Sequence, residues 1–281
     1  MTGRRRAALA AAAAVALLSS CTPATPAALP DGVTVELVQL RSDLSVGRMQ
    51  LHVRNASAGP VELLSARLAV PAFREEAVWK RAPATVAPGA ALNLPVTIPE
   101  VSCDAAAGEP VLTGEVRWDG EALPFRVRPE DPLGAVGSIV AAACAAESTE
   151  AAVAIEATGV AVEGTGPASV AVLTVGLRPT GSGRVRLVEV RPTVLLRAEE
   201  GDGGWPLDVA VQEETPPSAL TLPMEPARCD AHALADDKVG TRFPVVVELE
   251  DGTIGRFPLP LAAGVKDALL RFVAARCGLS G

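Results

Sequence analysis

The sequence predicts an all-β fold made of two tandem β-sandwich domains, each closed by a short C-terminal helix and one disulfide. Three observations support this prediction. One stretch of the chain occurs twice, short apolar runs alternate with turn residues, and four cysteines occupy matching places in the two copies. Regularly spaced short strands with Gly and Pro in the turns are typical of immunoglobulin-like sandwiches.

The repeated stretch runs from Ser45 to Arg67 and returns without a gap 124 positions later, from Ser169 to Arg191. A repeat of this period indicates two copies of one domain rather than a solenoid of small units. A chain of 281 residues is long enough for two separate cores. The identical pairs are Ser45/Ser169, Val46/Val170, Arg54/Arg178, Gly59/Gly183, Val61/Val185, Leu63/Leu187 and Arg67/Arg191.

The domain boundaries follow from the same patterns. Residues 33–145 are expected to form the first immunoglobulin-like domain and residues 152–281 the second, with Ala145 to Ala152 as a linker. Within the first domain, alternating residues predict strands; for example, Gln50 is expected on the polar side of its strand. The candidate strands are Val33–Leu40, Val46–Arg54, Val61–Val70, Ala90–Ile98, Val111–Trp118 and Ala122–Val127.

Each copy also carries a hairpin signal and a terminal helix. Asp119-Gly120 and Asp251-Gly252 are the residue pairs that tight hairpins favour. Asp131-Pro132 is expected to cap the first helix, with Pro at its first position. Apolar residues then recur at helical spacing up to Cys144, and in the second copy up to Cys277.

The chain has five cysteines, and four remain if Cys21 carries a lipid. Four cysteines allow three pairings. The repeat selects Cys103 with Cys144 and Cys229 with Cys277, because the first of each pair precedes Asp-Ala and the second is expected to end the helix. A metal site made of cysteines lacks the close Cys-x-x-Cys spacing that such sites use.

The N-terminus predicts export. A short basic segment, Met1 to Arg6, precedes the apolar run Ala7 to Leu18, so residues 1–20 are expected to be a signal peptide. Leu18-Ser19-Ser20-Cys21 resembles the bacterial lipobox, so Cys21 is expected to be lipidated and residues 21–32 to form a Pro-rich tether. The protein would then be held on the outer face of the cell membrane. The alternative is ordinary signal cleavage beside an incidental cysteine.

Composition excludes several partners. Removing residues 1–20, which hold three Arg and no acid, leaves 22 basic and 33 acidic residues and a net charge of −11. Nucleic acids and anionic membrane surfaces attract basic proteins, so neither is expected as a partner beyond the lipid anchor itself. The eight aromatic residues include no Tyr, which leaves few platforms for stacking on bases or sugars.

Few residues point to chemistry. His232 lies close to Asp236 and Asp237, a set that could bind a metal or supply a general base, although the spacing matches no known ligand frame. Nucleotide-binding and hydrolase motifs are absent, so no catalytic residue and no cofactor is predicted. The repeated arginines, such as Arg54 and Arg178, are expected to cover strand faces or pair across strands, for example Arg191 with Glu189. A duplicated contact with an anion or a partner is the alternative.

The Ala-rich signal with its lipobox, together with Arg228–His232 and Asp236–Thr241, resembles uncharacterised secreted lipoproteins of actinobacteria. This resemblance implies an envelope location and assigns no activity. The leading hypothesis is a lipid-anchored envelope protein with a non-catalytic binding or structural role, whose partner is an envelope protein, a wall polymer or a small ligand. The alternative is an envelope hydrolase or a metal-binding protein that uses the region around His232.

Overall fold

The computed structural model of the chain describes residues 28–181, 183–200, 203–235 and 240–279. Its N-terminal half, residues 28–134, contains β1 (Val33–Val38), α1 (Arg41–Leu44), β2 (Arg48–Asn55), β3 (Val61–Ala69), β4 (Ala77–Val78), β5 (Ala84–Val86), β6 (Ala91–Thr97), β7 (Val111–Trp118) and β8 (Glu121–Val127). Helix α2 (Ala135–Ala152) follows. The C-terminal half, residues 153–279, contains β9 (Val153–Glu163), the 3-10 turn η1 (Gly166–Ala168), β10 (Val170–Pro179), β11 (Val185–Val190), β12 (Leu196–Ala198), β13 (Trp205–Val211), β14 (Ser218–Pro226), α3 (Ala231–Ala235), β15 (Pro244–Leu249), β16 (Ile254–Pro258) and α4 (Val265–Arg276).

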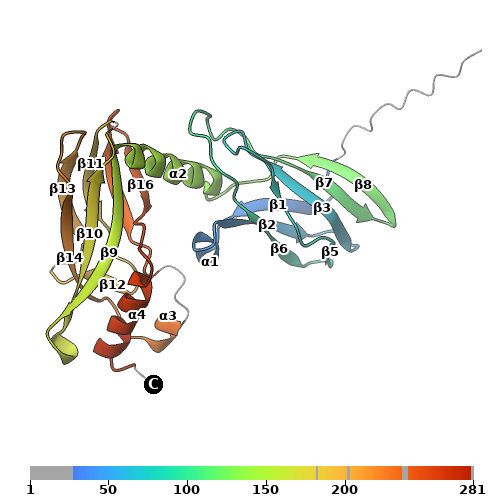
Figure 1. Cartoon of the computed structure of the whole chain (residues 1–281). Coiled ribbons are helices and arrows are strands. Elements are labelled where there is room, and N and C mark those ends of the chain that lie inside the picture. Colours follow the sequence, from blue (N-terminus) through green and yellow to red (C-terminus); the bar gives the residue numbers. More distant parts are fainter. Residues whose placement is uncertain (1–27, 182, 201–202, 236–239, 280–281) are drawn as a thin grey trace, which may run out of the picture.

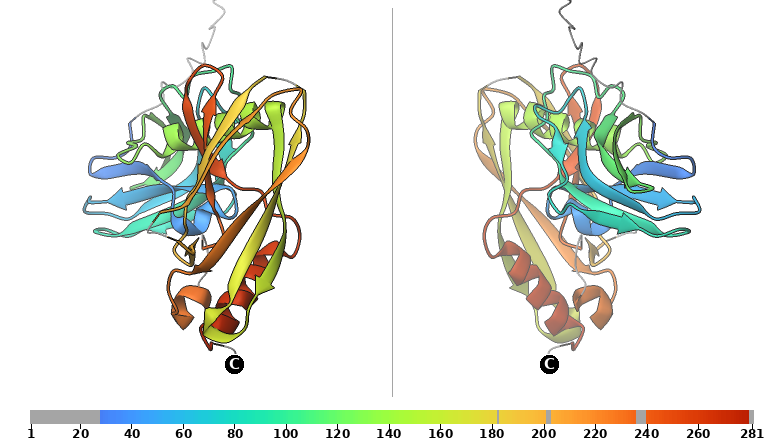
Figure 2. Two further views of the ribbon diagram at one scale, coloured as in Figure 1. Left: turned by 90° about the vertical axis from the view of Figure 1, so that its left-hand side faces the viewer. Right: turned by 90° about the vertical axis from the view of Figure 1, so that its right-hand side faces the viewer.

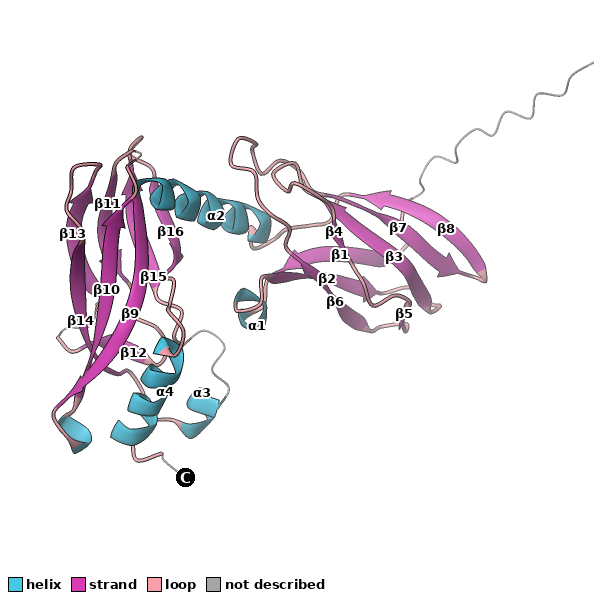
Figure 3. Ribbon diagram, in the orientation of Figure 1, coloured by secondary structure: helices cyan, strands magenta, loops and turns pink. Residues whose placement is uncertain are grey.

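The fold is mostly β, as predicted, and the strands form four antiparallel sheets (Figures 1 and 3). The N-terminal half has the sheets β1-β2-β6 and β4-β3-β7-β8, with β5 also paired to β3. The C-terminal half has the sheets β12-β14-β10-β9 and β13-β11-β15-β16. One cluster of buried apolar residues belongs to the strands of each half, so each half has its own core.

The strand order is the same in the two halves. Strands β1, β2 and β6 neighbour one another as β9, β10 and β14 do, and β3, β7 and β8 correspond to β11, β15 and β16. The register even shifts at the same place, between Leu63 and Ser65 in β3 and between Leu187 and Glu189 in β11, which are 124 positions apart. A bulge at matching positions indicates that the repeat extends to backbone detail, because bulges are specific features of a fold.

Alternating residues build these strands. In β2 the side chains of Met49, Leu51 and Val53 are fully buried, whereas Arg54 is exposed. The prediction that Gln50 lies on a solvated face is wrong: Gln50 is buried, because α1 folds over this part of β2 and offers a carboxylate to its amide. Two short strands of the N-terminal half, β4 and β5, were absent from the predicted set because they have only two and three residues.

The hairpins lie where the Asp-Gly pairs predict them. Strands β7 and β8 meet at Asp119-Gly120, and both residues have positive φ (49° and 83°), as a type I′ turn requires. Strands β15 and β16 meet around Asp251-Gly252, and of these two residues Gly252 has a positive φ and Asp251 does not. The Asp251 carboxylate accepts a hydrogen bond from the Thr253 amide. Hydrogen bonding to Thr253 holds the pKa of Asp251 below its ordinary value.

The disulfides join the cysteines that the repeat pairs. Cys103 is bonded to Cys144 and Cys229 to Cys277, with Cα–Cα distances of 5.4 and 5.3 Å. In each half the first cysteine lies in the connection between equivalent strands, β6–β7 or β14–β15, and the second lies in or at the end of the helix that follows the last strand. Each bridge therefore ties a helix to the loop end of its half.

Helix α2 corrects three expectations. It is not short; the predicted linker, Ala145 to Ala152, forms its second half; and Cys144 lies in its middle rather than at its end. Ala has the highest helix propensity, which explains why this patternless Ala-rich stretch continues the helix. The cap also differs, because the helix begins after Gly134 while the Asp131 carboxylate reaches forward to accept hydrogen bonds from the Ala135 and Val136 amides (2.7 and 3.0 Å).

The two ends of α2 belong to different cores. Val136, Val140 and Cys144 pack with the apolar cluster of the N-terminal half, whereas Ala145 and Ala152 belong to the cluster of the C-terminal half. Figure 1 shows α2 running from one half to the other, and Figure 2 shows α3 and α4 gathered at the end of the C-terminal half that carries the C-terminus. The helix is thus a shared structural element, not a flexible connection.

The N-terminal predictions fall largely outside the described residues. The signal peptide, Cys21 and the tether up to residue 27 lie there. The end of the predicted tether is already packed, since Leu29 contacts the core of the N-terminal half and the Gly32 carbonyl accepts a hydrogen bond from the Ala56 amide (2.8 Å). Among the helices of the described part, none is long and apolar enough to cross a membrane.

Candidate binding groove around helix α2

Three cavities of about 490, 460 and 520 Å³ lie along helix α2. The first two are lined by α2 and the C-terminal half, and the third is also lined by residues of the N-terminal half. Ala142 lines all three, so they are neighbouring parts of one depression, which we call the α2 groove. Each cavity is within the size range of small-molecule sites, about 300 to 1,000 Å³. The groove combines α2, the C-terminal half and, in the third cavity, the N-terminal half, so it is the candidate functional site of the described chain.

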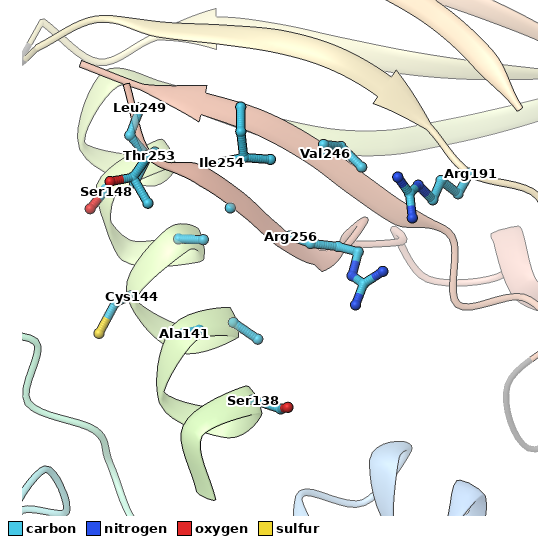
Figure 4. A pocket seen from close by; sticks show the side chains of 13 residues that line it. Ser138, Ala141, Cys144, Ser148, Arg191, Val246, Leu249, Thr253, Ile254 and Arg256 are labelled. Carbon is cyan, nitrogen blue, oxygen red and sulfur yellow. The ribbon is translucent and has the colours of Figure 1, made fainter. Parts of the chain in front are cut away.

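Figure 4 shows the first cavity, which lies between α2 and the outer face of β15 and β16. Ser138 and Ser148 contribute hydroxyl groups from the helix, and Ile254, which is 63% exposed, contributes an apolar side chain from β16. Arg191 and Arg256 extend from the sheet at the other end of the cavity. This part of the groove is a mixed surface with no acidic side chain among the described residues that line it.

Gly255 sets the distance between α2 and the sheet. A Cβ atom at this position would lie 2.5 Å from the Cβ of Ala145 and 3.3 Å from a methyl carbon of Val247. Two carbon atoms cannot approach to 2.5 Å, so only glycine permits this packing. The walls of the first cavity therefore depend on one pair of small residues, Gly255 and Ala145.

The third cavity, of about 520 Å³, contains an unusual collection of positive charge, and we call it the arginine cavity. Arg41 reaches it from α1, Arg242 from the segment before β15, and Arg256 from β16. None of the three makes an ion pair with a described residue, and no described acidic residue lines the cavity. Three unpaired guanidinium groups around one hollow attract an anion.

Arg242 shows the electrostatic consequence most clearly. Its side chain is partly buried, and desolvation lowers the pKa of the guanidinium below its ordinary value. Several other arginines of the described chain do form ion pairs with carboxylates, such as Arg186 with Asp208 and Glu248. Burying a cation without a counter-ion costs free energy. A bound anion would therefore stabilise the charged form of Arg242 in this cavity.

Two local structures present the cavity walls. Thr193 accepts hydrogen bonds at its hydroxyl oxygen from the Leu195 and Leu196 amides (3.2 and 3.1 Å), which folds the loop that carries Val194. In the other half, Asp43 is 1% exposed and its carboxylate accepts hydrogen bonds from the Leu40 amide (3.0 Å) and the Gln50 side chain (2.6 Å). These bonds fasten α1 to β2 and thereby place Arg41 and Leu44 at the cavity.

Replacing Asp43 by Ala is expected to lower the free energy of unfolding by about 2 kcal/mol, because the Leu40 amide and the Gln50 amide group would lose their acceptor. The measurement is urea unfolding of the full chain. Asp104→Ala is the matched control, because Asp104 is exposed and has no hydrogen bond or ion pair with a described residue. Equal stability of the two variants would show that the buried carboxylate does not hold α1.

The repeated arginines have separate roles. Arg191 donates a hydrogen bond from Nε to Glu189 (2.6 Å), which confirms the predicted pairing, and Arg67 lies 3.7 Å from Glu76. Arg54 has no ion pair with a described residue and lines none of the three cavities, while Arg178 lines the second. The arginines of the arginine cavity are different ones, and none of them belongs to an identical pair of the repeat.

Of the three metal candidates, only His232 lies within the described residues. His232 lies exposed on α3, and its backbone amide donates to the Asp230 carboxylate (2.9 Å). Asp236 and Asp237 lie outside the described residues. The described part of the chain contains no group of three or more His, Cys, Asp or Glu residues that could hold a metal ion. The other histidine, His52, lies 2.7 Å from the Asn93 amide oxygen across β2 and β6, a contact between strands.

No protein-family model matches the chain, and no curated protein sequence is similar to it. Among solved structures, the chain is similar to the exo-chitosanase CsxA of Amycolatopsis orientalis, with 15% identity and a TM-score of 0.20 over 81% of this chain and 26% of that one. It is also similar to the YadV chaperone, with 12% identity and a TM-score of 0.23 over 81% of this chain and 100% of that one. The chain spans about a quarter of the length of the exo-chitosanase. Similarities at these TM-scores support neither a fold family nor a function.

Proposed function

We propose that this protein is a lipid-anchored envelope protein with a non-catalytic binding role, and that the α2 groove holds its partner. The observation that carries the proposal is the groove itself, a set of neighbouring cavities along the helix that takes part in both cores. The groove offers hydroxyl, apolar and guanidinium groups and, in its second cavity, the exposed carboxylates of Glu150 and Glu156. No described histidine, the commonest general base, lines any of the three cavities.

The proposal includes two tandem immunoglobulin-like domains, residues 33–145 and 152–281. Matching strand order, a matching bulge and a disulfide in each half support this division. Because α2 takes part in both cores, the domains are expected to present the groove as one rigid surface. Sandwich domains commonly bind through loops and faces that a rigid framework holds in place.

The location belongs to the proposal as well. The signal peptide over residues 1–20 and a lipid on Cys21 would hold the protein on the outer face of the membrane, with an envelope protein or a wall component as partner. The two disulfides agree with an oxidising compartment outside the cytoplasm. Metabolic labelling with a fatty acid analogue tests the anchor: label and membrane association are expected in the natural protein and should both be lost in Cys21→Ala.

Site-specific photo-cross-linking tests the binding role. A photoreactive amino acid at Ala142, which lines all three cavities, is expected to give a discrete adduct when the full chain is expressed in its envelope. The matched control places the same amino acid at Arg126, an exposed position on β8 that lines none of these cavities. Adducts that form equally at both positions, or at neither, would contradict the groove as the binding site.

A further inference from the structure

The ligand class follows from the charge balance of the arginine cavity. Arg41, Arg242 and Arg256 bring three positive charges to one hollow of about 520 Å³. A single carboxylate has one negative charge and two acceptor oxygens, which one guanidinium group can satisfy. A phosphate monoester carries about −1.5 to −2 charges at neutral pH and three acceptor oxygens, so it can accept from several guanidinium groups together.

Apart from Thr193, the rest of the wall is apolar. Leu44 is 38% exposed and Val194 is 44% exposed, and both line the cavity together with Pro192 and Phe257. Large apolar side chains on a surface commonly mark a contact with another molecule when they are grouped. Here they border the same hollow as the unpaired arginines, so the ligand that fits has an anionic end beside an apolar one.

The cavity is also assembled from both halves. Arg41 and Leu44 come from the N-terminal half, Ala142 comes from the shared helix, and the remaining lining residues come from the C-terminal half. We propose that the arginine cavity binds a phosphate monoester carried on an apolar group. This proposal rests on the binding function proposed above and names the chemistry of what is bound.

Calorimetric titration of the full chain in a non-ionic detergent tests the proposal. Butyl phosphate is the probe, and the comparison ligands are inorganic phosphate, the diester dibutyl phosphate and the carboxylate pentanoate. Butyl phosphate is expected to bind at least about tenfold more tightly than the diester and the carboxylate, because each missing charge-assisted hydrogen bond costs at least that factor. It should also bind more tightly than inorganic phosphate, because the apolar wall adds contacts. Equal binding of the diester or the carboxylate would overturn the proposal.

Charge-matched variants locate the site. Arg256→Gln and Arg242→Gln are each expected to weaken butyl phosphate binding about tenfold or more, whereas Arg54→Gln, which removes the same charge outside the cavity, should leave it unchanged. Because Arg242 makes no ion pair with any described residue, Arg242→Gln is expected not to lower the midpoint of thermal unfolding. If Arg54→Gln weakened binding by the same factor, the cavity arginines would act only through the general charge of the protein. If Arg242→Gln clearly lowered the stability, Arg242 would have a structural role. Either result would contradict the proposed site.

Two further comparisons distinguish a lipid ligand from a soluble one, and the anion proposal from the proposed binding function. Dihexanoylphosphatidic acid, a water-soluble lipid phosphomonoester, should outcompete butyl phosphate if the natural ligand is a lipid head group, and should bind no better if it is a soluble ester. If no phosphate ester binds while cross-linking at Ala142 persists, the anion proposal is wrong and the binding function stands. If both fail, both are wrong.

Discussion

Replacing Cys103 and Cys144 together by Ser is expected to lower the free energy of unfolding of the N-terminal half by about 4 kcal/mol. The bridge closes a loop with a sequence separation of 41, and the chain-entropy model gives about this value for such a loop. A loss of this size is a large fraction of the roughly 5 to 15 kcal/mol that stabilises a typical domain. Cys144 also lies in the middle of α2, so the bridge fastens the shared helix to the N-terminal half.

Tryptophan fluorescence during urea unfolding can follow each half separately. Trp79 and Trp118 lie in the N-terminal half, and Trp205 is the only one of the three tryptophans in the other half. In a Trp205→Phe background, the double variant should unfold at a much lower urea concentration than the protein with both disulfides. Loss of the other bridge, by Cys229→Ser with Cys277→Ser, is the matched control and should leave this signal nearly unchanged. If the urea midpoint were the same with and without the Cys103–Cys144 bridge, this bridge would not stabilise the N-terminal half.

Gly255→Val is expected to lower the free energy of unfolding by about 3 kcal/mol, because overpacking at a closed contact costs about 1 to 3 kcal/mol and the added Cβ alone would meet the Cβ of Ala145. Helix α2 would have to move away from β16. The first cavity of the α2 groove lies along this contact, so its shape would change as well. Thermal and urea unfolding of the full chain measure the loss.

A double-mutant cycle isolates this contact. Gly255→Ala should destabilise, and Ala145→Gly in the same chain should restore part of the loss even though Gly in a helix normally costs about 1 kcal/mol. Gly159→Ala is the matched control, because a Cβ there meets no atom within 4 Å and its φ is not positive. If Gly255→Ala were as harmless as Gly159→Ala, α2 would not be held against the sheet by this pair.

The prediction from sequence was most successful where the signal is local or repeated. Alternation predicted β7 without error and β3 to within a residue, and Asp119-Gly120 predicted its hairpin, because these patterns arise within a few residues. The pairing of the four cysteines followed from the repeat, because two copies of one fold place equivalent residues at equivalent positions. The short strands β4 and β5 were missed, since their pairing with β3 comes from tertiary contacts.

The candidate site was not predictable in this way. Arg41 and Arg256 are separated by most of the chain, and neither belongs to a motif or to an identical pair of the repeat. Local composition could suggest a linker at Ala145 to Ala152, but it could not show that two cores bury opposite ends of one helix.

By itself, the sequence determined the strand pattern, the duplication and the disulfide partners, because alternation, turn chemistry and repetition are written along the chain. Only the tertiary structure decided that α2 belongs to both halves and that three arginines without an ion pair to a described residue share one cavity. The physical reason is that charge and burial depend on distances in space, which folding sets between residues far apart in the chain.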